Sequence, residues 1–216
     1  QEISKRMQLV GKLIIKSKDK IIKFLSEEST GRISSIDKEG FPQIIPMNFV
    51  FLDNSVYMHS HIRGEKIENI KHNSKVGFEV DRNLEFLPSY FSDPEDASLA
   101  DTLYISVIIK GEATLVEDKK EKVLALNGLM KKYQPEGRYK PMREDMDVLD
   151  ATAVIKIIPK EMNGKYKIGQ NMDKDEKLEL AQKIRDRNSK TAENTLEIMG
   201  FSINNDKLVM KEDVEW

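Results

Sequence analysis

The sequence predicts an α+β fold that is mainly β: a six-stranded antiparallel barrel with peripheral helices and a C-terminal helical extension. Short β-rich segments separated by turn residues occupy the first half of the chain, and helix-patterned segments become frequent in the second half. The 216 residues, of which 39% are hydrophobic, suffice for one enlarged domain with a buried core. Apolar runs fall far short of the roughly 20 residues that span a bilayer, so we expect no membrane segment.

The composition excludes several classes of protein. Lys and Arg number 35 and Asp and Glu number 37, so the formal net charge of -2 gives no global positive field for nucleic acid or anionic lipid. The sequence contains no cysteine, which excludes disulfides, thiolate zinc sites, iron–sulfur clusters and a cysteine nucleophile. Because no basic-then-apolar signal opens the sequence, we expect a cytoplasmic protein.

The N-terminal part of the chain is expected to pass from an arm through a helix into a sheet. Residues 1–16 are basic and weakly patterned, which is typical of a flexible arm. Ser17 can cap a short helix that stops near Thr30 and Gly31. Three β-rich segments then predict a meander of antiparallel strands: 31–36, 43–52 and 55–60.

The middle of the chain alternates between helix and strand. Residues 64–73 are patterned as a helix, and residues 76–80 return to strand. Residues 82–101 contain two prolines and several acids, so we expect a loop with no more than one helical turn. Residues 102–116 form a long β-rich run in which Gly111 marks a bend or bulge.

Helices dominate the C-terminal part. Residues 119–132 carry an apolar stripe at helical spacing, and residues 150–158 are expected to form a strand that ends before Pro159. Residues 173–199 are predicted as a long helix that can break at residues 188–189. The chain is thereby divided into three predicted parts: an arm (1–16), a barrel domain (17–165) and a helical extension packed on the barrel (166–216).

Two of the three histidines form a pair at the end of the third predicted strand, in His59-Ser60-His61. Residues two apart on a strand point to the same face, so His59 and His61 could together bind a metal. No Asp, Glu or third His has ligand-like spacing beside them, so we favour a cofactor or substrate pocket over a metal site. A strand end that simply exposes two polar rings is the remaining alternative.

A local anion site is indicated immediately after the histidine pair. Arg63 and Lys66 flank the expected helix start at Gly64, where orphan backbone N–H groups and the positive end of the helix dipole add to two cations. This combination suits a phosphate, although charged residues at a helix start are more often solvated surface. No Walker loop, Gly-x-Gly-x-x-Gly or Gly-x-Ser-x-Gly motif supports a nucleotide triphosphate, Rossmann or esterase site.

The order of several segments resembles a known family. The resemblance rests on the segments Gly31-Arg32-Ile33-Ser34-Ser35, Pro46-Met47-Asn48-Phe49-Val50, Val56-Tyr57-Met58-His59-Ser60, Gly64-Glu65-Lys66-Ile67-Glu68-Asn69-Ile70, Val76-Gly77-Phe78-Glu79-Val80-Asp81 and the strand from Tyr104 to Ala113. In this order and spacing, over residues 19–165, they are similar to the nitroimidazole-resistance (Nim) branch of the pyridoxamine 5'-phosphate oxidase-like flavoproteins.

The resemblance implies a split β-barrel homodimer that holds FMN in a groove between its subunits. It also implies a role for each matching residue: Pro46, Met47, Asn48 and Phe49 run along the isoalloxazine ring, His59 and Ser60 line the ring and ribityl side, Arg63 and Lys66 hold the phosphate, and Ser106 faces the flavin. Met47 and Phe49 are equally consistent with core side chains whose backbone alone touches the flavin.

Three features depart from the family pattern. The arginine-rich set with which pyridoxamine phosphate oxidases hold the substrate phosphate is absent, so we do not expect vitamin B6 oxidation. His61 stands where small residues are common in relatives. Residues 164–171 and the following helix resemble another branch, the FMN-binding proteins described as transcriptional regulators, so the branch is left open.

Two functions are compatible with these features. The first is an FMN-dependent oxidoreductase that passes electrons from a reduced nicotinamide or similar donor to a small electrophile such as a nitroaromatic, with His59 as the candidate catalytic proton donor or substrate contact. The second is a non-enzymatic FMN-binding sensor that acts through a partner and uses the 173–199 helix as its surface. The charge balance and the lack of a helix-turn-helix pattern argue against direct nucleic-acid binding.

Overall fold

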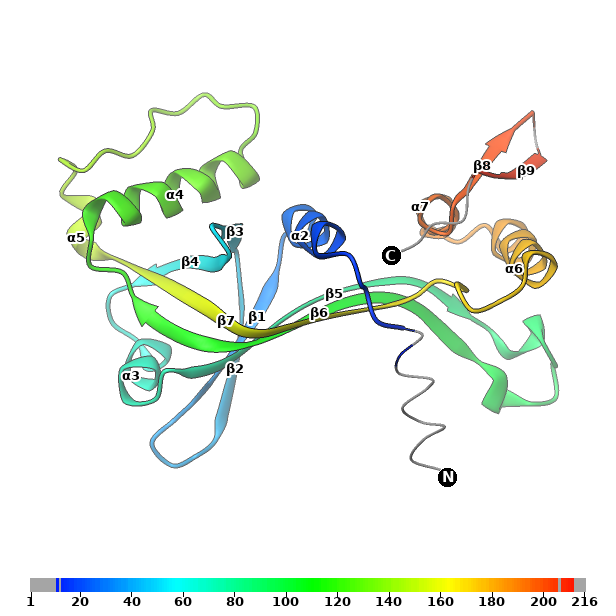
Figure 1. The fold of residues 1–216 in the computed structure, drawn as a ribbon, viewed down its shortest axis with the longest axis horizontal. Helices are drawn as coiled ribbons and strands as arrows, with labels where there is room; N and C mark the ends of the chain where they lie inside the picture. Colours follow the sequence, from blue (N-terminus) through cyan, green and yellow to red (C-terminus); the bar gives the residue numbers. More distant parts are fainter. Residues whose placement is uncertain (1–10, 12, 206, 212–216) are drawn as a thin grey trace. The chain divides into compact units, whose positions relative to one another are not determined.

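The computed structural model describes residues 11, 13–205 and 207–211 (Figure 1). They form two compact units. The barrel unit consists of residues 18–80 and 107–163. The terminal unit consists of the described residues up to 17, residues 81–106 and the described residues from 164 onward.

A curled antiparallel sheet is the main element of the fold, which confirms the predicted α+β class. The sheet has seven strands rather than the predicted six, in the order β2-β1-β5-β6-β7-β4-β3. The strands are β1 (Gly31–Ile36), β2 (Pro42–Met47), β3 (Val50–Leu52), β4 (Ser55–His61), β5 (Lys75–Leu87), β6 (Asp101–Leu115) and β7 (Thr152–Lys167). β5, β6 and β7 each contribute residues to both units.

The extra strand arises because the predicted strand 43–52 is interrupted at Asn48 and Phe49, which we call the seam. β2 pairs with β1, whereas β3 pairs with β4. The two strands therefore lie at opposite edges of the sheet order, although the seam alone separates them in the chain. A two-residue link can reach from one edge to the other only if the sheet curls.

The helices of the barrel unit pack against its strands and against one another. They are α2 (Lys18–Glu27), α3 (Glu65–His72), α4 (Lys119–Tyr133) and α5 (Val148–Ala151). α2 and α4 both contact β3, and α4 also contacts β4 (Figure 1). The predicted helix 119–132 is confirmed, and the Asp118 side chain caps it by accepting a hydrogen bond from Glu121 N at 2.9 Å. α2 ends before the predicted stop at Thr30.

Apolar side chains of α4 and the β3–β4 edge form a core cluster in the barrel unit. Its buried members are Val50, Tyr57, Val116, Ala125, Leu126, Leu129, Leu149 and Val154. Phe49 and Phe78 meet edge to face, with ring centroids 5.1 Å apart. Gly31 leaves room for the Phe78 ring, because a Cβ at residue 31 would lie 2.1 Å from Phe78 Cζ.

The segment predicted as a loop, residues 82–101, begins as strand in the terminal unit. β5 continues to Leu87, and two short 3₁₀ turns, η1 (Ser89–Phe91) and η2 (Ala97–Leu99), precede β6. The loop was predicted from two prolines and several acids, but both prolines follow β5 and one of the acids, Glu85, lies inside it. Glu85 is nevertheless buried, since Arg187 pairs with it.

β7 also runs past its predicted end. Pro159 lies inside the strand, which continues to Lys167. β4 pairs with β7 from Thr152 to Ile157, so Pro159 lies beyond that ladder. Its missing N–H therefore removes no hydrogen bond to β4.

The C-terminal extension is helical and ends in a small hairpin. α6 (Lys174–Arg187) ends at Asn188, whose positive φ of 49° stops the helix. The predicted break at residues 188–189 is thereby confirmed, and α7 (Ala192–Ile198) follows. β8 (Phe201–Asn204) and β9 (Lys207–Met210) form an antiparallel hairpin for which the sequence interpretation made no prediction.

The end of the segment expected to be an arm pairs with β7 within the terminal unit. Ile14 bridges Lys165, and Ile15 is buried and donates its N–H to Gly164 O at 2.9 Å. Residues 1–10 and 12 lie outside the described residues. In the described part of the chain, no helix has both the length and the apolar composition needed to cross a membrane.

Candidate functional site

The residues predicted to run along a flavin begin at the end of β2 and cross the seam. Pro46 and Met47 are the last two residues of β2. Pro46 and Asn48 are exposed, and Met47 is half-buried. Phe49 is fully buried, so its side chain belongs to the core and only its backbone can face a ligand.

His59 and Ser60 lie at the exposed end of β4, where both pair with β7. Alternation along the strand places Tyr57, His59 and His61 on one face. Tyr57 is buried against α4, whereas the two histidines are exposed. Within the described ranges, no group of three or more His, Cys, Asp or Glu side chains is arranged to hold a metal ion.

The seam runs next to this end of β4. Val50, the first residue of β3, pairs with Tyr57 in an antiparallel register. The chain therefore enters β3 at Asn48 on the side where β4 continues towards His59. The β3–β4 ladder brings the end of the predicted ring-binding segment together with the predicted His59–Ser60 wall.

A tight turn joins β4 to α3 and carries the two predicted phosphate ligands. Its backbone is fixed by His61, whose Nδ1 accepts a hydrogen bond from Arg63 N at 3.1 Å. This gives His61 a structural role that the sequence did not indicate. Gly64 follows with a φ of 148°, a conformation that favours glycine, and its carbonyl accepts a hydrogen bond from Ile67 N at 3.0 Å.

The first turn of α3 is open to a ligand. Gly64 offers no side chain to cap the helix, Arg63 is exposed and Lys66 is half-buried. No ion pair within the described part of the chain uses Arg63 or Lys66, whereas Lys71 is paired with Glu68 at 2.9 Å. Backbone N–H groups and two uncommitted cations at one helix start suit a phosphate.

The buried face of α3 fixes the position of these cations. Ile67 and Ile70 are buried, and Asn69 is buried between them on the same helix. Asn69 Nδ2 donates a hydrogen bond to Ser35 Oγ of β1 at 3.3 Å. The helix is therefore tied to the sheet by both apolar packing and a polar contact.

A polar chain that the sequence did not reveal supports the β4 strand. Tyr57 Oη and Lys156 Nζ both donate to Glu121 Oε1 of α4, at 2.7 and 2.6 Å. The hydrogen bond from Lys156 holds the pKa of Glu121 below its usual value, and burial raises the pKa of Tyr57. Three residues on three distant segments carry this contact, so no local motif could have predicted it.

Ser106, the last predicted site residue, lies at a half-buried position of β6 and belongs to the terminal unit. The other predicted site residues all belong to the barrel unit. Within that unit, the structure places the seam, the end of β4 and the start of α3 in one continuous region.

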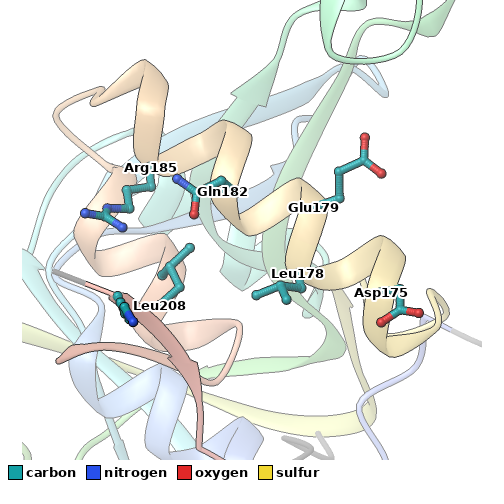
Figure 2. Close-up of a pocket in the computed structure, with 7 residues that line it drawn as sticks. Asp175, Leu178, Glu179, Gln182, Arg185 and Leu208 are labelled. Atoms are coloured by element: carbon teal, nitrogen blue, oxygen red, sulfur yellow. The ribbon is translucent and has the colours of Figure 1, made fainter. Parts of the chain in front are cut away.

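Two surface grooves lie apart from these residues. In the terminal unit, a groove of about 630 Å³ runs between α6 and β9 (Figure 2) and has Leu178 and Leu208 on its apolar wall. Its rim mixes acidic Asp175 and Glu179 with basic Arg185. In the barrel unit, a groove of about 370 Å³ is lined by β1, β5, β6 and β7. None of the predicted site residues lines either groove.

Known structures share this fold. A protein from Bacteroides thetaiotaomicron, named as a candidate 5-nitroimidazole antibiotic resistance protein, is 24% identical with a TM-score of 0.60, over 71% of this chain and 86% of that chain. The flavocytochrome Anf3 from Azotobacter vinelandii is 18% identical with a TM-score of 0.61, over 72% of this chain and 69% of that chain. The FAD and heme binding protein from Mycobacterium smegmatis is 15% identical with a TM-score of 0.59, over 77% of this chain and 78% of that chain.

Sequence comparison assigns the family. No curated protein sequence matches the chain. The family model described as pyridoxamine 5'-phosphate oxidase matches residues 17–166, which contain the whole barrel unit. The match spans well over half of the 216 residues. The chain belongs to the pyridoxamine 5'-phosphate oxidase family.

Proposed function

We propose that the chain is an FMN-binding oxidoreductase of the nitroimidazole-resistance branch of its family. It passes electrons from a reduced nicotinamide or similar donor to a small electrophile such as a nitroaromatic. The observation that carries the proposal is the uncommitted pair Arg63 and Lys66 at the open start of α3, directly after the exposed His59–Ser60 end of β4.

The names of similar proteins support a flavin as the cofactor. One similar structure is a flavocytochrome, and another is named for binding FAD and heme. The Bacteroides protein is named for nitroimidazole resistance, which supports a nitroaromatic acceptor. FMN is preferred over FAD in this proposal, because a phosphate held by Arg63, Lys66 and helix N–H groups leaves little room for an adenylate extension.

Each group of site residues has a distinct role in the proposal. A bound flavin supplies the redox chemistry. Arg63 and Lys66 bind the phosphate, the backbone from Pro46 to Phe49 orients the ring, and Ser106 faces the flavin. His59 is exposed beside the seam and serves as the proton donor or substrate contact.

We propose a homodimer with the flavin groove between its subunits. β2 is an edge strand in which every residue is at least partly exposed. Ile44 and the neighbouring Phe41 are 64% and 66% exposed. Exposed apolar side chains on an edge strand favour a partner that covers them. A second copy of the chain would also provide the other wall of a groove along Pro46 and Asn48.

A non-enzymatic FMN-binding sensor is the second candidate. The groove between α6 and β9 favours it, because Leu178 and Leu208 form an apolar surface within a charged rim (Figure 2). Such a surface is suited to a partner protein rather than to a redox substrate.

Flavin titration and a turnover assay test the proposal. Apo-protein titrated with FMN and, separately, with FAD should give the absorption spectrum of bound flavin with tighter binding of FMN. With FMN bound, NADH or NADPH should be oxidised faster when a nitroimidazole is added. Binding without turnover across a panel of nitroaromatic and quinone acceptors would favour the sensor, and binding of neither flavin would contradict both candidates.

A further inference from the structure

The seam is the point at which the chain leaves one edge of the sheet and joins the other. Asn48 and Phe49 belong to no strand: the β1–β2 ladder ends at Met47 and the β3–β4 ladder begins at Val50, so neither ladder includes the Phe49 backbone. Phe49 is fully buried, and buried backbone N–H groups are almost always paired. The seam therefore depends on a hydrogen-bond partner from outside the sheet.

Tyr133, the last residue of α4, is that partner. Its Oη accepts a hydrogen bond from Phe49 N at 2.9 Å. The same oxygen lies 2.6 Å from Ser29 O and 3.1 Å from Phe49 O. A hydroxyl has one proton, so it donates to one carbonyl at a time, and Ser29 O is the nearer. Burial raises the pKa of Tyr133, so the hydroxyl keeps this proton at neutral pH.

Lys132 fixes the side chain of Phe49. Its Nζ lies 3.7 Å from the centroid of the Phe49 ring and donates a hydrogen bond to Leu25 O at 2.9 Å. The Leu25 carbonyl belongs to the last turn of α2, where carbonyls lack intrahelical partners. Two consecutive residues of α4 thus hold the backbone and the ring of Phe49.

The position of Phe49 is passed on to the residues that precede it. Neighbouring Cα atoms keep a fixed separation across a planar peptide, so a shift of Phe49 moves Asn48. Pro46 and Met47 pair with Arg32 and Gly31 of β1, so the ladder holds the chain up to Met47 and the shift falls on Asn48. The exposed segment is therefore pinned at β1 and at Tyr133.

We propose that Tyr133, assisted by Lys132, is a positioning residue that sets the course of the chain from Met47 through Asn48 to Phe49 and thereby the fit of the flavin ring. This role rests on the proposed function, because it presumes that the segment binds a flavin. Neither α4 residue is assigned to the flavin site itself. Both act through Phe49.

Tyr133→Phe tests the proposal, because it removes Oη and keeps the ring. In apo-protein, amide hydrogen exchange of the peptide spanning residues 46–50 should accelerate about tenfold, since the Phe49 N–H loses its acceptor. The Kd for FMN should rise about tenfold, and the visible absorption bands of bound FMN should shift. Lys132→Met should act in the same direction and provides a second variant if Tyr133→Phe does not fold.

Tyr139→Phe is the matched control. Tyr139 is a half-buried tyrosine of the same unit, and its hydroxyl makes no hydrogen bond within the described residues. Tyr139→Phe should leave unchanged the amide hydrogen exchange of residues 46–50, the Kd for FMN and the absorption spectrum of bound FMN. The positioning role is overturned if wild-type protein binds FMN and folded Tyr133→Phe and Lys132→Met match it in all three measurements. Wild-type protein that binds neither flavin would instead overturn the proposed function, and this role with it.

Discussion

Arg187 Nη1 lies 2.9 Å from Glu85 Oε1, and the side chain of Glu85 is 1% exposed. Ser189 Oγ and Thr191 Oγ1 donate to the other carboxylate oxygen at 2.5 and 2.6 Å. The connection between α6 and α7 thus encloses a carboxylate from β5. Within the terminal unit, this contact attaches the helical extension to the strand.

Removing the cation from this pair should destabilise the protein. Arg187→Met leaves the buried Glu85 charge without its counter-ion, and the free energy of unfolding should fall by about 3 kcal/mol. Urea unfolding followed by circular dichroism measures the change. Lys110→Met is the control, because the Lys110–Glu161 pair is exposed and should contribute less than about 1 kcal/mol. Equal losses in the two variants would show that burial of Glu85 is not the cause.

Arg63→Ala and Lys66→Ala should each weaken FMN binding roughly tenfold to a hundredfold, since charge-assisted hydrogen bonds contribute on the order of 1.5 to 3 kcal/mol each. The double variant need not lose the sum, because both cations contact one phosphate. Lys71→Ala is the control for simple loss of charge, since Lys71 is already paired with Glu68. Fluorescence titration gives the three Kd values. An equal effect of Lys71→Ala would mean that long-range electrostatics, not a phosphate pocket, is at work.

Light scattering at micromolar concentration should give twice the monomer mass. Ile44→Lys should shift the protein towards monomer and weaken FMN binding in parallel, because it puts a charge on the exposed edge strand β2. Leu124→Lys is a suitable control, since Leu124 is also exposed but lies on α4. A monomeric wild-type protein with FMN bound would rule out the proposed dimer.

Lys132 should make the free energy of unfolding rise with pH above about 8. Burial lowers the pKa of Lys132 from 10.5 to about 8, against a smaller opposing effect of Glu28. Between these two pH values, the unfolded chain binds a proton that the folded chain has lost, so alkalinity favours the folded state. Lys132→Met should abolish this rise. Urea unfolding of both proteins from pH 7 to 9.5 tests it, and a constant difference between them would contradict the pKa assignment.

Local patterns in the sequence predict most elements of the barrel unit. Turn residues and β-rich runs locate β1 and β4, and the apolar stripe of residues 119–132 locates α4. The break between β2 and β3 was not predicted because residues 43–52 form one β-rich run in the sequence. Only long-range pairing separates the two strands, since one joins β1 and the other joins β4.

The candidate site likewise contains residues that local patterns reveal and residues that only long-range contacts reveal. Arg63, Gly64 and Lys66 are recognisable from the sequence, because a helix start, a glycine and two cations are close together in the chain. The roles of Tyr133 and Glu121 cannot be recognised from the sequence, because each contacts a residue from a distant segment. Phe49 belongs to both groups: its motif is visible in the sequence, but its ring packs against Phe78 and Lys132 from distant segments.

The seam also dictates the order in which the sheet can assemble. β1 and β2 form a local hairpin, and so do β3 and β4, each closed by a short turn. The ladder between β4 and β7, however, joins Val56 to Ile157, and it can form only after most of the barrel unit has been brought together. Until then, the two hairpins are tethered through Asn48 and Phe49 with no sheet between them. We therefore expect the two hairpins to form before the β4–β7 ladder closes, and closure of that ladder to be the slow step of folding.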